Sequence, residues 1–249
     1  VLLPPPGPGF WPLRRGGGLA MNRKDELEFN LAAVDQRIEA ACERAGRRRD
    51  SVTLIVITKT YPARDVDLLA ELGVRHVGEN RHPEAGDKYA DVEHPLRWHF
   101  VGGLQTNKAA AVAQYADVVH SVDRVKLVTA LHRGAHAADR QLDCLVQVAL
   151  SNDKGRSGVA PAEAMGVADA IAAAGDLRLA GVMAVAPLGA DPAAAFAELA
   201  QVAAVITSQH PNATMISAGM SDDLEEAIQA GATHLRIGRS VLGVRPTTG

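Results

Sequence analysis

The chain has 249 residues, of which 47% are hydrophobic and 4% aromatic, and its formal net charge at pH 7 is −3. That length can bury a large core and suits one α/β barrel or two smaller domains. The slightly acidic balance and the few aromatic rings exclude the basic, ring-rich surface of nucleic-acid-binding proteins. Cys42 and Cys144 stand alone and outside any paired motif, which indicates a reducing, cytoplasmic location.

The first twenty residues are rich in proline and glycine and show no periodic apolar face. We therefore expect residues 1–20 to be a disordered leader and residues 21–249 to form one folded domain. The leader lacks the charge order and long apolar core of a signal peptide, and no later segment is apolar enough to span a bilayer. We expect no membrane association. We also assign no metal site, because His132 and His136 have no acidic or thiol ligand nearby.

From residue 21 onward, the apolar pattern predicts a first helix that Asn22 caps and Gly46 ends, followed by alternating strand and helix signals. The strand signals cover residues 52–58, 74–78, 98–102, 118–122, 145–150, 181–185, 214–217 and 234–237. Helical stretches cover residues 63–72, 107–115, 124–138, 161–174, 192–207 and 222–230. Eight such units predict an α/β fold, a single (β/α)8 TIM-type barrel preceded by an N-terminal helix, with a doubly wound open sheet as the alternative.

Lys59 closes an almost wholly apolar run, residues 51–59, that is typical of a buried strand. Ending such a strand on an ammonium group costs desolvation energy, and one common use of that cost is a lysine that attacks a carbonyl. The sequence thus favours a Schiff-base lysine. A strand-end lysine that reaches out to water is the alternative.

Polar and glycine-rich segments follow the predicted strands, as expected if function sits at their C-terminal ends. Strand seven runs into Ser217 and Gly219, while strand eight contains Arg236 and runs into Gly238. In such barrels these two loops often hold a phosphate, which glycine allows the backbone to approach closely. Because strand eight closes the barrel against strand one, we expect Arg236 and Gly238 to lie near Lys59.

An amine, a phosphate cradle and an arginine at one mouth match the needs of pyridoxal 5′-phosphate (PLP): an amine for its aldehyde, donors for its phosphate and a partner for its ring nitrogen. A buried glutamate is the alternative partner for Arg236. Ile57 should point to the same side as Lys59 and pack against the ring, although ordinary core packing explains it equally well. Helix capping explains residues 221–223.

Five ordered segments resemble the YggS/PROSC family of pyridoxal phosphate homeostasis proteins, which shares the alanine racemase N-terminal barrel. They are LIVITKT at 54–60, GENR at 78–81, WHFVGGLQTNK at 98–108, SAGMSDD at 217–223 and RIG at 236–238. The resemblance implies that Lys59 forms the internal aldimine, that Asn80 lies by the cofactor and that Arg236 meets the pyridine nitrogen. It also implies that Ser217, Gly238 and the residue after it hold the phosphate.

Two positions depart from the family pattern. Arg239 stands where the family usually has a small hydroxylated residue, so either Arg239 binds the phosphate through charge-assisted bonds or Ser240 contributes instead. Gly103 replaces the usual histidine of the loop after strand three.

The sequence favours a carrier of PLP over a catalyst. Racemases that this barrel resembles obtain one of their two bases from an added C-terminal β domain, whereas six residues follow Gly243 here. An arginine at the ring nitrogen also weakens the ring as an electron sink. We expect a monomer that passes PLP to PLP-requiring apo-enzymes by imine exchange. The alternatives are an amino-acid racemase with Tyr61, Asn80 or His99 as second base and, less favoured, a Schiff-base aldolase.

Overall fold

The computed structural model describes residues 22–150 and 157–243, and it confirms the predicted closed barrel of eight parallel strands. The strands follow one another in chain order, and β8 closes the barrel against β1. They are β1 Thr53–Ile57, β2 His76–Glu79, β3 Arg97–Phe100, β4 Val118–Val122, β5 Leu142–Gln147, β6 Leu177–Met183, β7 Met215–Ser217 and β8 His234–Ile237. The open-sheet alternative is wrong. The predicted leader, residues 1–20, lies outside the described residues.

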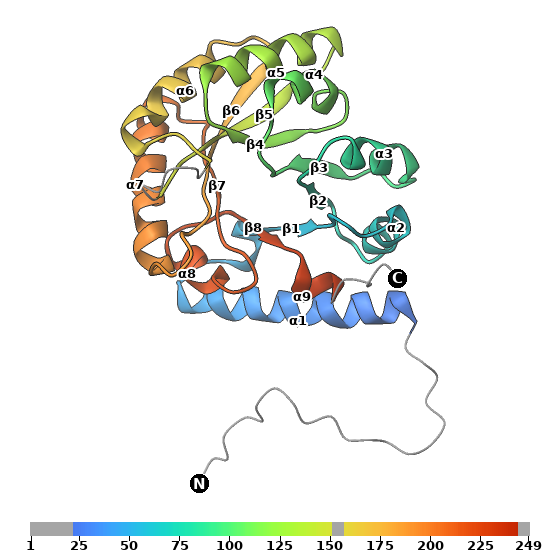
Figure 1. Cartoon of the computed structure of the whole chain (residues 1–249). Coiled ribbons are helices and arrows are strands. Elements are labelled where there is room, and N and C mark those ends of the chain that lie inside the picture. Colours follow the sequence, from blue (N-terminus) through green and yellow to red (C-terminus); the bar gives the residue numbers. More distant parts are fainter. Residues whose placement is uncertain (1–21, 151–156, 244–249) are drawn as a thin grey trace, which may run out of the picture.

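The helices lie outside the barrel (Figure 1); α1 precedes β1, α9 follows β8, and the others connect successive strands. They are α1 Arg23–Arg44, α2 Ala63–Glu71, α3 Glu84–Asp91, α4 Ala109–Val112, α5 Val125–Ala137, α6 Ala164–Ala172, α7 Pro192–Gln209, α8 Leu224–Gln229 and α9 Arg239–Leu242, with 3-10 turns at Arg49–Ser51, Thr106–Lys108 and Pro161–Glu163. None of the helices in the two described ranges combines the length and apolar character needed to cross a bilayer.

The predicted and observed elements differ where charged residues lie inside strands. The limits of β4 and β8 agree with the sequence prediction, whereas β5 begins at Leu142 and β6 at Leu177, earlier than predicted. Both early segments carry a charge, Asp143 and Arg178, and these two residues are paired in the ladder between β5 and β6. The sequence did not predict α3, which follows Pro83, contains Gly86 and buries only Ala85, so it lacks an apolar stripe.

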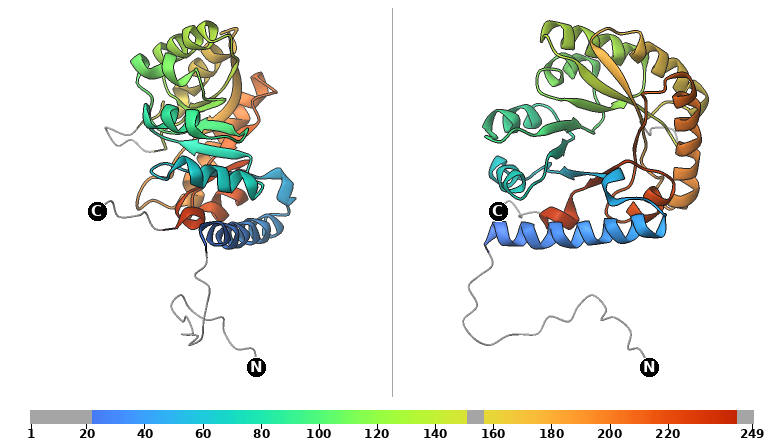
Figure 2. Two further views of the ribbon diagram at one scale, coloured as in Figure 1. Left: turned by 90° about the vertical axis from the view of Figure 1, so that its right-hand side faces the viewer. Right: turned by 180° about the vertical axis from the view of Figure 1, so that it is seen from behind.

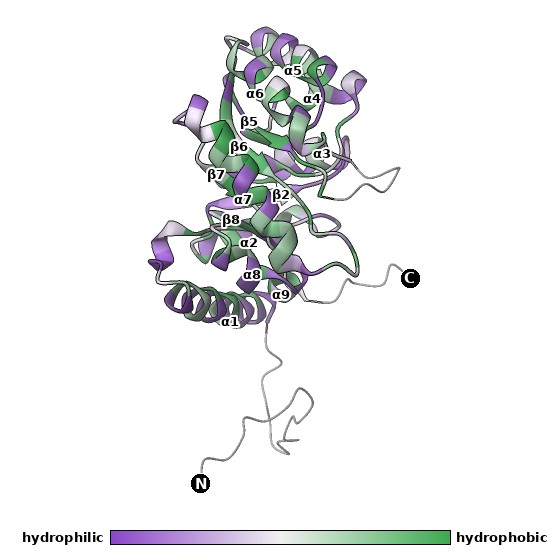
Figure 3. Cartoon of the chain, turned by 90° about the vertical axis from the view of Figure 1, so that its left-hand side faces the viewer, coloured by the Kyte–Doolittle hydropathy of each residue, from purple (hydrophilic) through white to green (hydrophobic). Residues whose placement is uncertain are grey.

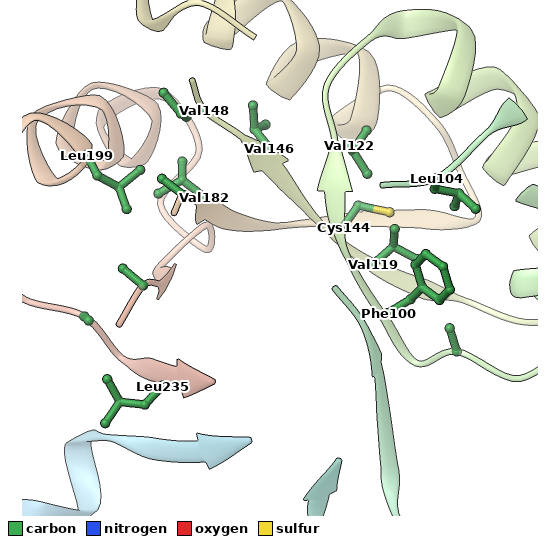
Figure 4. Packing of buried hydrophobic residues seen from close by; sticks show 14 of the residues in the cluster. Phe100, Leu104, Val119, Val122, Cys144, Val146, Val148, Val182, Leu199 and Leu235 are labelled. Atoms are coloured by element: carbon green, nitrogen blue, oxygen red, sulfur yellow. The ribbon is translucent and has the colours of Figure 1, made fainter. Parts of the chain in front are cut away.

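Apolar packing occurs on both sides of the barrel wall. A small cluster inside the barrel contains Val118, Leu145, Ala180 and Met183, with Met215 against it. The main core lies between the strands and the surrounding helices; Figure 4 shows part of it, with Leu199 of α7 beside Val182 of β6. Figure 3 shows β5, β6 and β7 as largely hydrophobic, whereas α1 alternates between hydrophobic and polar residues. This two-sided burial explains why the strands read as nearly continuous apolar runs.

Helix α1 runs past the β8 and β1 side of the barrel, against α8 and α9 (Figures 1 and 2). The side chain of Asn22 accepts a hydrogen bond from the Asp25 amide at 3.1 Å, which confirms the predicted cap. Arg37 pairs with both carboxylate oxygens of Glu225 at 2.6 Å and donates to the Ser221 carbonyl. Asn30 donates to the Val241 carbonyl at 2.9 Å. Helix α1 therefore anchors the loop that follows β7 and the helix that follows β8.

We expect the Arg37→Ala substitution to lower the free energy of unfolding by about 1–2 kcal/mol, because it removes charge-assisted bonds from α1 to Glu225 of α8 and to Ser221 of the β7–α8 loop. Urea denaturation followed by circular dichroism measures this change. Arg48→Ala is the matched control, because the Arg48 side chain pairs with its exposed neighbour Asp50 and its loss should change stability by less than about 0.5 kcal/mol. Equal effects of the two substitutions would show that the Arg37 contacts do not anchor the loop.

Candidate functional site

Lys59 lies two residues after the end of β1, at the C-terminal mouth of the barrel, and borders two cavities. The larger cavity, of about 530 Å³, is lined by Ile57, Lys59, Tyr61, Met220, Ser221, Asp222, Arg236, Gly238 and Arg239. The smaller cavity, of about 320 Å³, is lined by Lys59, Thr60, Tyr61, Glu79, Asn80, Arg81, Glu84 and Lys88. Lys59 and Tyr61 are common to both, so Lys59 stands between the two cavities.

The backbone immediately after Lys59 is strained. Thr60 has a φ of 71°, a left-handed conformation that costs a β-branched residue about 1–2 kcal/mol. Two hydrogen bonds of Tyr61 hold this turn. The Tyr61 amide donates to the Thr58 carbonyl at 3.1 Å, and the Tyr61 hydroxyl donates to the Gly243 carbonyl at 2.8 Å. Strain of this kind concentrates at functional sites, and here it sets the direction in which the chain leaves β1.

A buried ion pair fixes the end of β1 from outside the barrel. Glu79 at the end of β2 pairs with Lys88 of α3, and both side chains are almost fully buried. The Thr58 hydroxyl donates to Glu79 Oε1 at 2.7 Å, and Lys88 Nζ donates to the Thr58 carbonyl at 2.7 Å. Because loss of either charged partner would leave the other buried and unpaired, this group holds the residue before Lys59 firmly.

Glycine on β2 makes room for the cavity wall. Ile57 lines the larger cavity on the same side as Lys59, as the sequence predicts. A Cβ on Gly78 would lie 2.5 Å from Ile57 Cδ1, so a larger residue at this position would push the end of the Ile57 side chain out of its place.

Arg236 is 5% exposed and lines the larger cavity from β8. Its Nη1 donates to Ser217 Oγ at 2.6 Å and its Nη2 donates to the Ala184 carbonyl at 2.9 Å. Within residues 22–150 and 157–243 no carboxylate forms an ion pair with it, so the alternative of a buried glutamate partner is wrong. Burial lowers the pKa of Arg236 to about 10, against a smaller raising effect of Asp223, which leaves the guanidinium charged at neutral pH.

The loops after β7 and β8 form the far wall of the larger cavity. Gly219 has a φ of 89°, and a Cβ there would lie 2.6 Å from the Ala227 Cβ, so the turn requires glycine. The N-cap of α8 is Asp223, and its Oδ1 accepts from the Met220 amide at 2.6 Å. Ser221 and Asp222 line the cavity and are not the N-cap, so the capping explanation is wrong for these two residues. Asp223 stands at the N-cap position, although its side chain makes no capping hydrogen bond.

A line of buried histidines lies behind Arg236, and the sequence analysis missed its role. His120 Nδ1 lies 2.9 Å from Ser217 Oγ, and its Nε2 lies 2.8 Å from His99 Nδ1. His99 Nε2 in turn lies 2.9 Å from His76 Nδ1. The sequence offers His99 as a second base or as a core or solvent-facing residue; it is 1% exposed and borders neither cavity at Lys59, so it is a core residue. The sequence signal that could have revealed this line is one histidine in each of the neighbouring strands β2, β3 and β4.

The structure brings most of the predicted site residues together. Lys59, Ile57, Arg236, Gly238 and Arg239 border the larger cavity, while Asn80 borders the smaller one beside Lys59. Ser217 and Gly219 are not among the lining residues, and the Ser217 hydroxyl is bonded to Arg236 below the cavity. The side chain of Arg239 is 73% exposed and reaches Asp222 at 3.4 Å. The roles of these residues toward a cofactor remain predictions.

Residues 29–246 match the family model described as "Alanine racemase, N-terminal domain", so the fold and the mouth of the barrel define a protein of this class. An alanine racemase from Corynebacterium glutamicum has the same fold, with a TM-score of 0.65 at 15% identity over 91% of this chain and 62% of the racemase. At that identity the likeness shows the fold alone.

Closer relatives define the family more narrowly. The pyridoxal phosphate homeostasis protein of Mycobacterium bovis is 40% identical over 245 residues, which cover 90% of this chain and 95% of the relative. The Escherichia coli protein of the same name is 36% identical over 228 residues, covering 89% and 97%. A structure of PipY from Synechococcus elongatus with PLP bound has a TM-score of 0.77 at 32% identity, covering 87% of this chain and 100% of PipY. The chain belongs to the pyridoxal phosphate homeostasis protein family, as its motifs predict.

The buried histidines predict a loss of stability in acid. Burial lowers the pKa of His99 and His120 well below the usual 6.5 and that of His234 to about 4. Unfolded chains bind protons at these residues from about pH 6.5 downward, whereas the folded chain does not. Their contribution to stability is therefore complete above about pH 6.5 and decreases as the pH falls, by up to about 1.4 kcal/mol per pH unit for each histidine.

Urea denaturation at pH 7 and pH 5 measures this dependence. We expect His120→Leu to reduce the difference between the two pH values, and we expect Gln201→Ala, at an exposed position of α7 without a titratable group, to leave it unchanged. An unchanged difference in His120→Leu would contradict the prediction, whatever the absolute stability of the variant.

Proposed function

We propose that this protein binds PLP in the cytoplasm, holds it as a Schiff base on Lys59, and keeps it in reserve for PLP-requiring apo-enzymes without transforming a substrate itself. The observation that carries the proposal is that the amine of Lys59 and the charged guanidinium of Arg236 share one cavity of about 530 Å³ at the barrel mouth. The relatives named for pyridoxal phosphate homeostasis and the PLP-bound PipY structure support it.

The chemistry of the larger cavity fits PLP. When bound, PLP supplies an aldehyde that combines with an amine, and Lys59 is the lysine on the wall of this cavity. Arg236 lies across from it with two of its donors used by neutral acceptors, which leaves others for a ring nitrogen. We assign the phosphate to the rim formed by Gly238 and Arg239, where Ser221 is better placed than the predicted Ser217.

Carriage is supported by the second cavity. Transfer of the cofactor by imine exchange requires a second amine to reach the carbon that Lys59 holds. Because Lys59 also borders the cavity lined by Asn80, an incoming amine has an approach that does not pass the ring and phosphate sites. Asn80 then lies on the side of Lys59 at which exchange takes place.

Racemisation is supported less well by the same geometry. Arg236 stays charged at neutral pH, so it does not protonate a ring nitrogen, and an unprotonated ring is a weak electron sink. Of the proposed second bases, His99 lies outside both cavities and the Tyr61 hydroxyl donates to the Gly243 carbonyl. No feature of the described residues favours the Schiff-base aldolase. We propose that the carrier acts as a monomer.

We expect purified protein incubated with PLP to absorb visible light through the Schiff base and to lose this absorbance in Lys59→Ala. Borohydride reduction should add one pyridoxyl group to the peptide that contains Lys59, located by mass spectrometry. Lys126→Ala, at an exposed lysine of α5, is the matched control and should retain both signals. Visible absorbance that persists in Lys59→Ala would rule out the proposed attachment, and its absence from the unmodified protein would favour the aldolase.

We expect the PLP-loaded protein to activate an apo-aminotransferase and to leave the optical rotation of L-alanine and other single enantiomers unchanged. The reasons are that His99 lies outside both cavities, that the Tyr61 hydroxyl is bonded to the Gly243 carbonyl, and that Arg236 is charged beside the ring nitrogen. Polarimetry and a coupled aminotransferase assay measure the two outcomes. Racemisation that depends on Lys59 would refute the non-catalytic role, and activation no faster than from PLP released into solution would refute direct transfer.

A further inference from the structure

A line of hydrogen-bonded side chains crosses the barrel interior, from Arg236 to the N-terminal end of β2. Arg236 contacts Ser217, which contacts His120, then His99 and then His76, and every step is between 2.6 and 2.9 Å. Ser217, His120 and His99 are at most 1% exposed. His76 is half-buried and lines a cleft at the end of the barrel opposite to the mouth. The cofactor cavity is thus connected to the other end of the fold by imidazole rings.

The proton positions along this line follow from its first member. A guanidinium only donates, so Ser217 Oγ must accept from Arg236. Within the described part of the chain, the other side-chain contact of this oxygen is His120 Nδ1, to which the hydroxyl then donates its own hydrogen. His120 therefore carries its proton on Nε2 and donates to His99 Nδ1. Because the Nδ1 of His99 accepts, its proton is on Nε2, which donates to His76 Nδ1. The neutral rings of His120 and His99 therefore share the tautomer with the proton on Nε2.

Burial keeps these rings neutral. Desolvation lowers the pKa of His99 and His120, and the neighbouring charges act in the same direction. Those charges are Arg97 near the outer end and Arg236 near the inner end, while His234 of β8 lies beside the line. An additional proton on the line would also force His120 to donate to Ser217, which would leave the serine hydrogen without its acceptor.

The order of the protons suits a buried cation. Each imidazole presents its unprotonated Nδ1 toward Arg236 and its N–H away from it, so the negative end of each dipole faces the guanidinium. Asp223 raises the pKa of Arg236 without an ion pair to it among the described residues. The line therefore stabilises the buried charge without neutralising it, and the charge remains available at the cavity.

We propose that His120, supported by His99 and His76, is a positioning residue for Arg236. The proton-ordered line fixes Ser217 as an acceptor, and Ser217 holds the guanidinium in the place where it meets the ring nitrogen of PLP. This inference rests on the proposed function for the identity of the ligand, whereas the proton order applies to the protein without any ligand.

The first test is the tautomer of each ring, measured from imidazole 15N shifts in PLP-free protein at neutral pH. We expect His99 and His120 to carry the proton on Nε2, with unprotonated Nδ1. A proton on Nδ1 of His120 would overturn the inference. Because this measurement uses the unmodified protein, it decides the matter even if substitutions in the line prevent folding.

The second test compares two substitutions of His120. In His120→Asn the amide oxygen replaces Nδ1 as the acceptor for Ser217, whereas His120→Leu removes the acceptor at similar volume. We expect Leu to weaken PLP binding about tenfold, as the loss of one hydrogen bond implies, and Asn to restore it to within about twofold. The 15N shift of the ring nitrogen in labelled PLP should change in the Leu variant, and His136→Leu is the control.

Equal effects of Leu and Asn, or no effect of either, would overturn the positioning role even when PLP binds normally to the unmodified protein. If the unmodified protein bound no PLP and formed no pyridoxyl adduct on reduction, the proposed function would fail and this inference would fail with it. The two failures are therefore distinguishable.

Discussion

The burial of one guanidinium group determines how the site is built. Arg236 lies inside the barrel wall on β8, where its acceptors among the described residues are neutral, the hydroxyl of Ser217 and the carbonyl of Ala184. Ser217 is the last residue of β7 and Ala184 directly follows β6, so the charged group of Arg236 links three neighbouring strands. Since Ile55 of β1 is paired with Arg236, the same closure brings this charge to the strand that ends at Lys59. A misplaced β8 would leave a buried cation without acceptors.

Lys59 owes its position to the surroundings of the β1 end. The ion pair of Glu79 and Lys88 holds Thr58 from outside, and the strained turn at Thr60 directs the chain away. The backbone beside Lys59 is consequently fixed, while the residue borders two cavities. A lysine with a fixed backbone and a cavity on each side suits a residue that must capture a small aldehyde and later pass it to another amine.

The barrel interior is divided between apolar packing and polar contacts. Val118 and Leu145 belong to the apolar half, whereas the histidines and Ser217 occupy the half behind Arg236. Barrel interiors are usually filled by layers of branched apolar side chains, so the polar half gives up packing that would stabilise the fold. The outer core between strands and helices, together with α1 across the last two loops, supplies the stability that permits this.

The sequence by itself determined the barrel, the capped first helix, the family and the residues at the strand ends, with Lys59, Arg236 and Gly238 in one mouth. These features follow from local periodicity and from the rule that parallel strands end at a common face. Only the tertiary structure decided that Ser221 lines the cavity while Ser217 lies below it, and that imidazoles from three strands form one line. Periodicity reports how deeply a residue is buried, but contacts across a barrel depend on register and shear, which no single segment of sequence encodes.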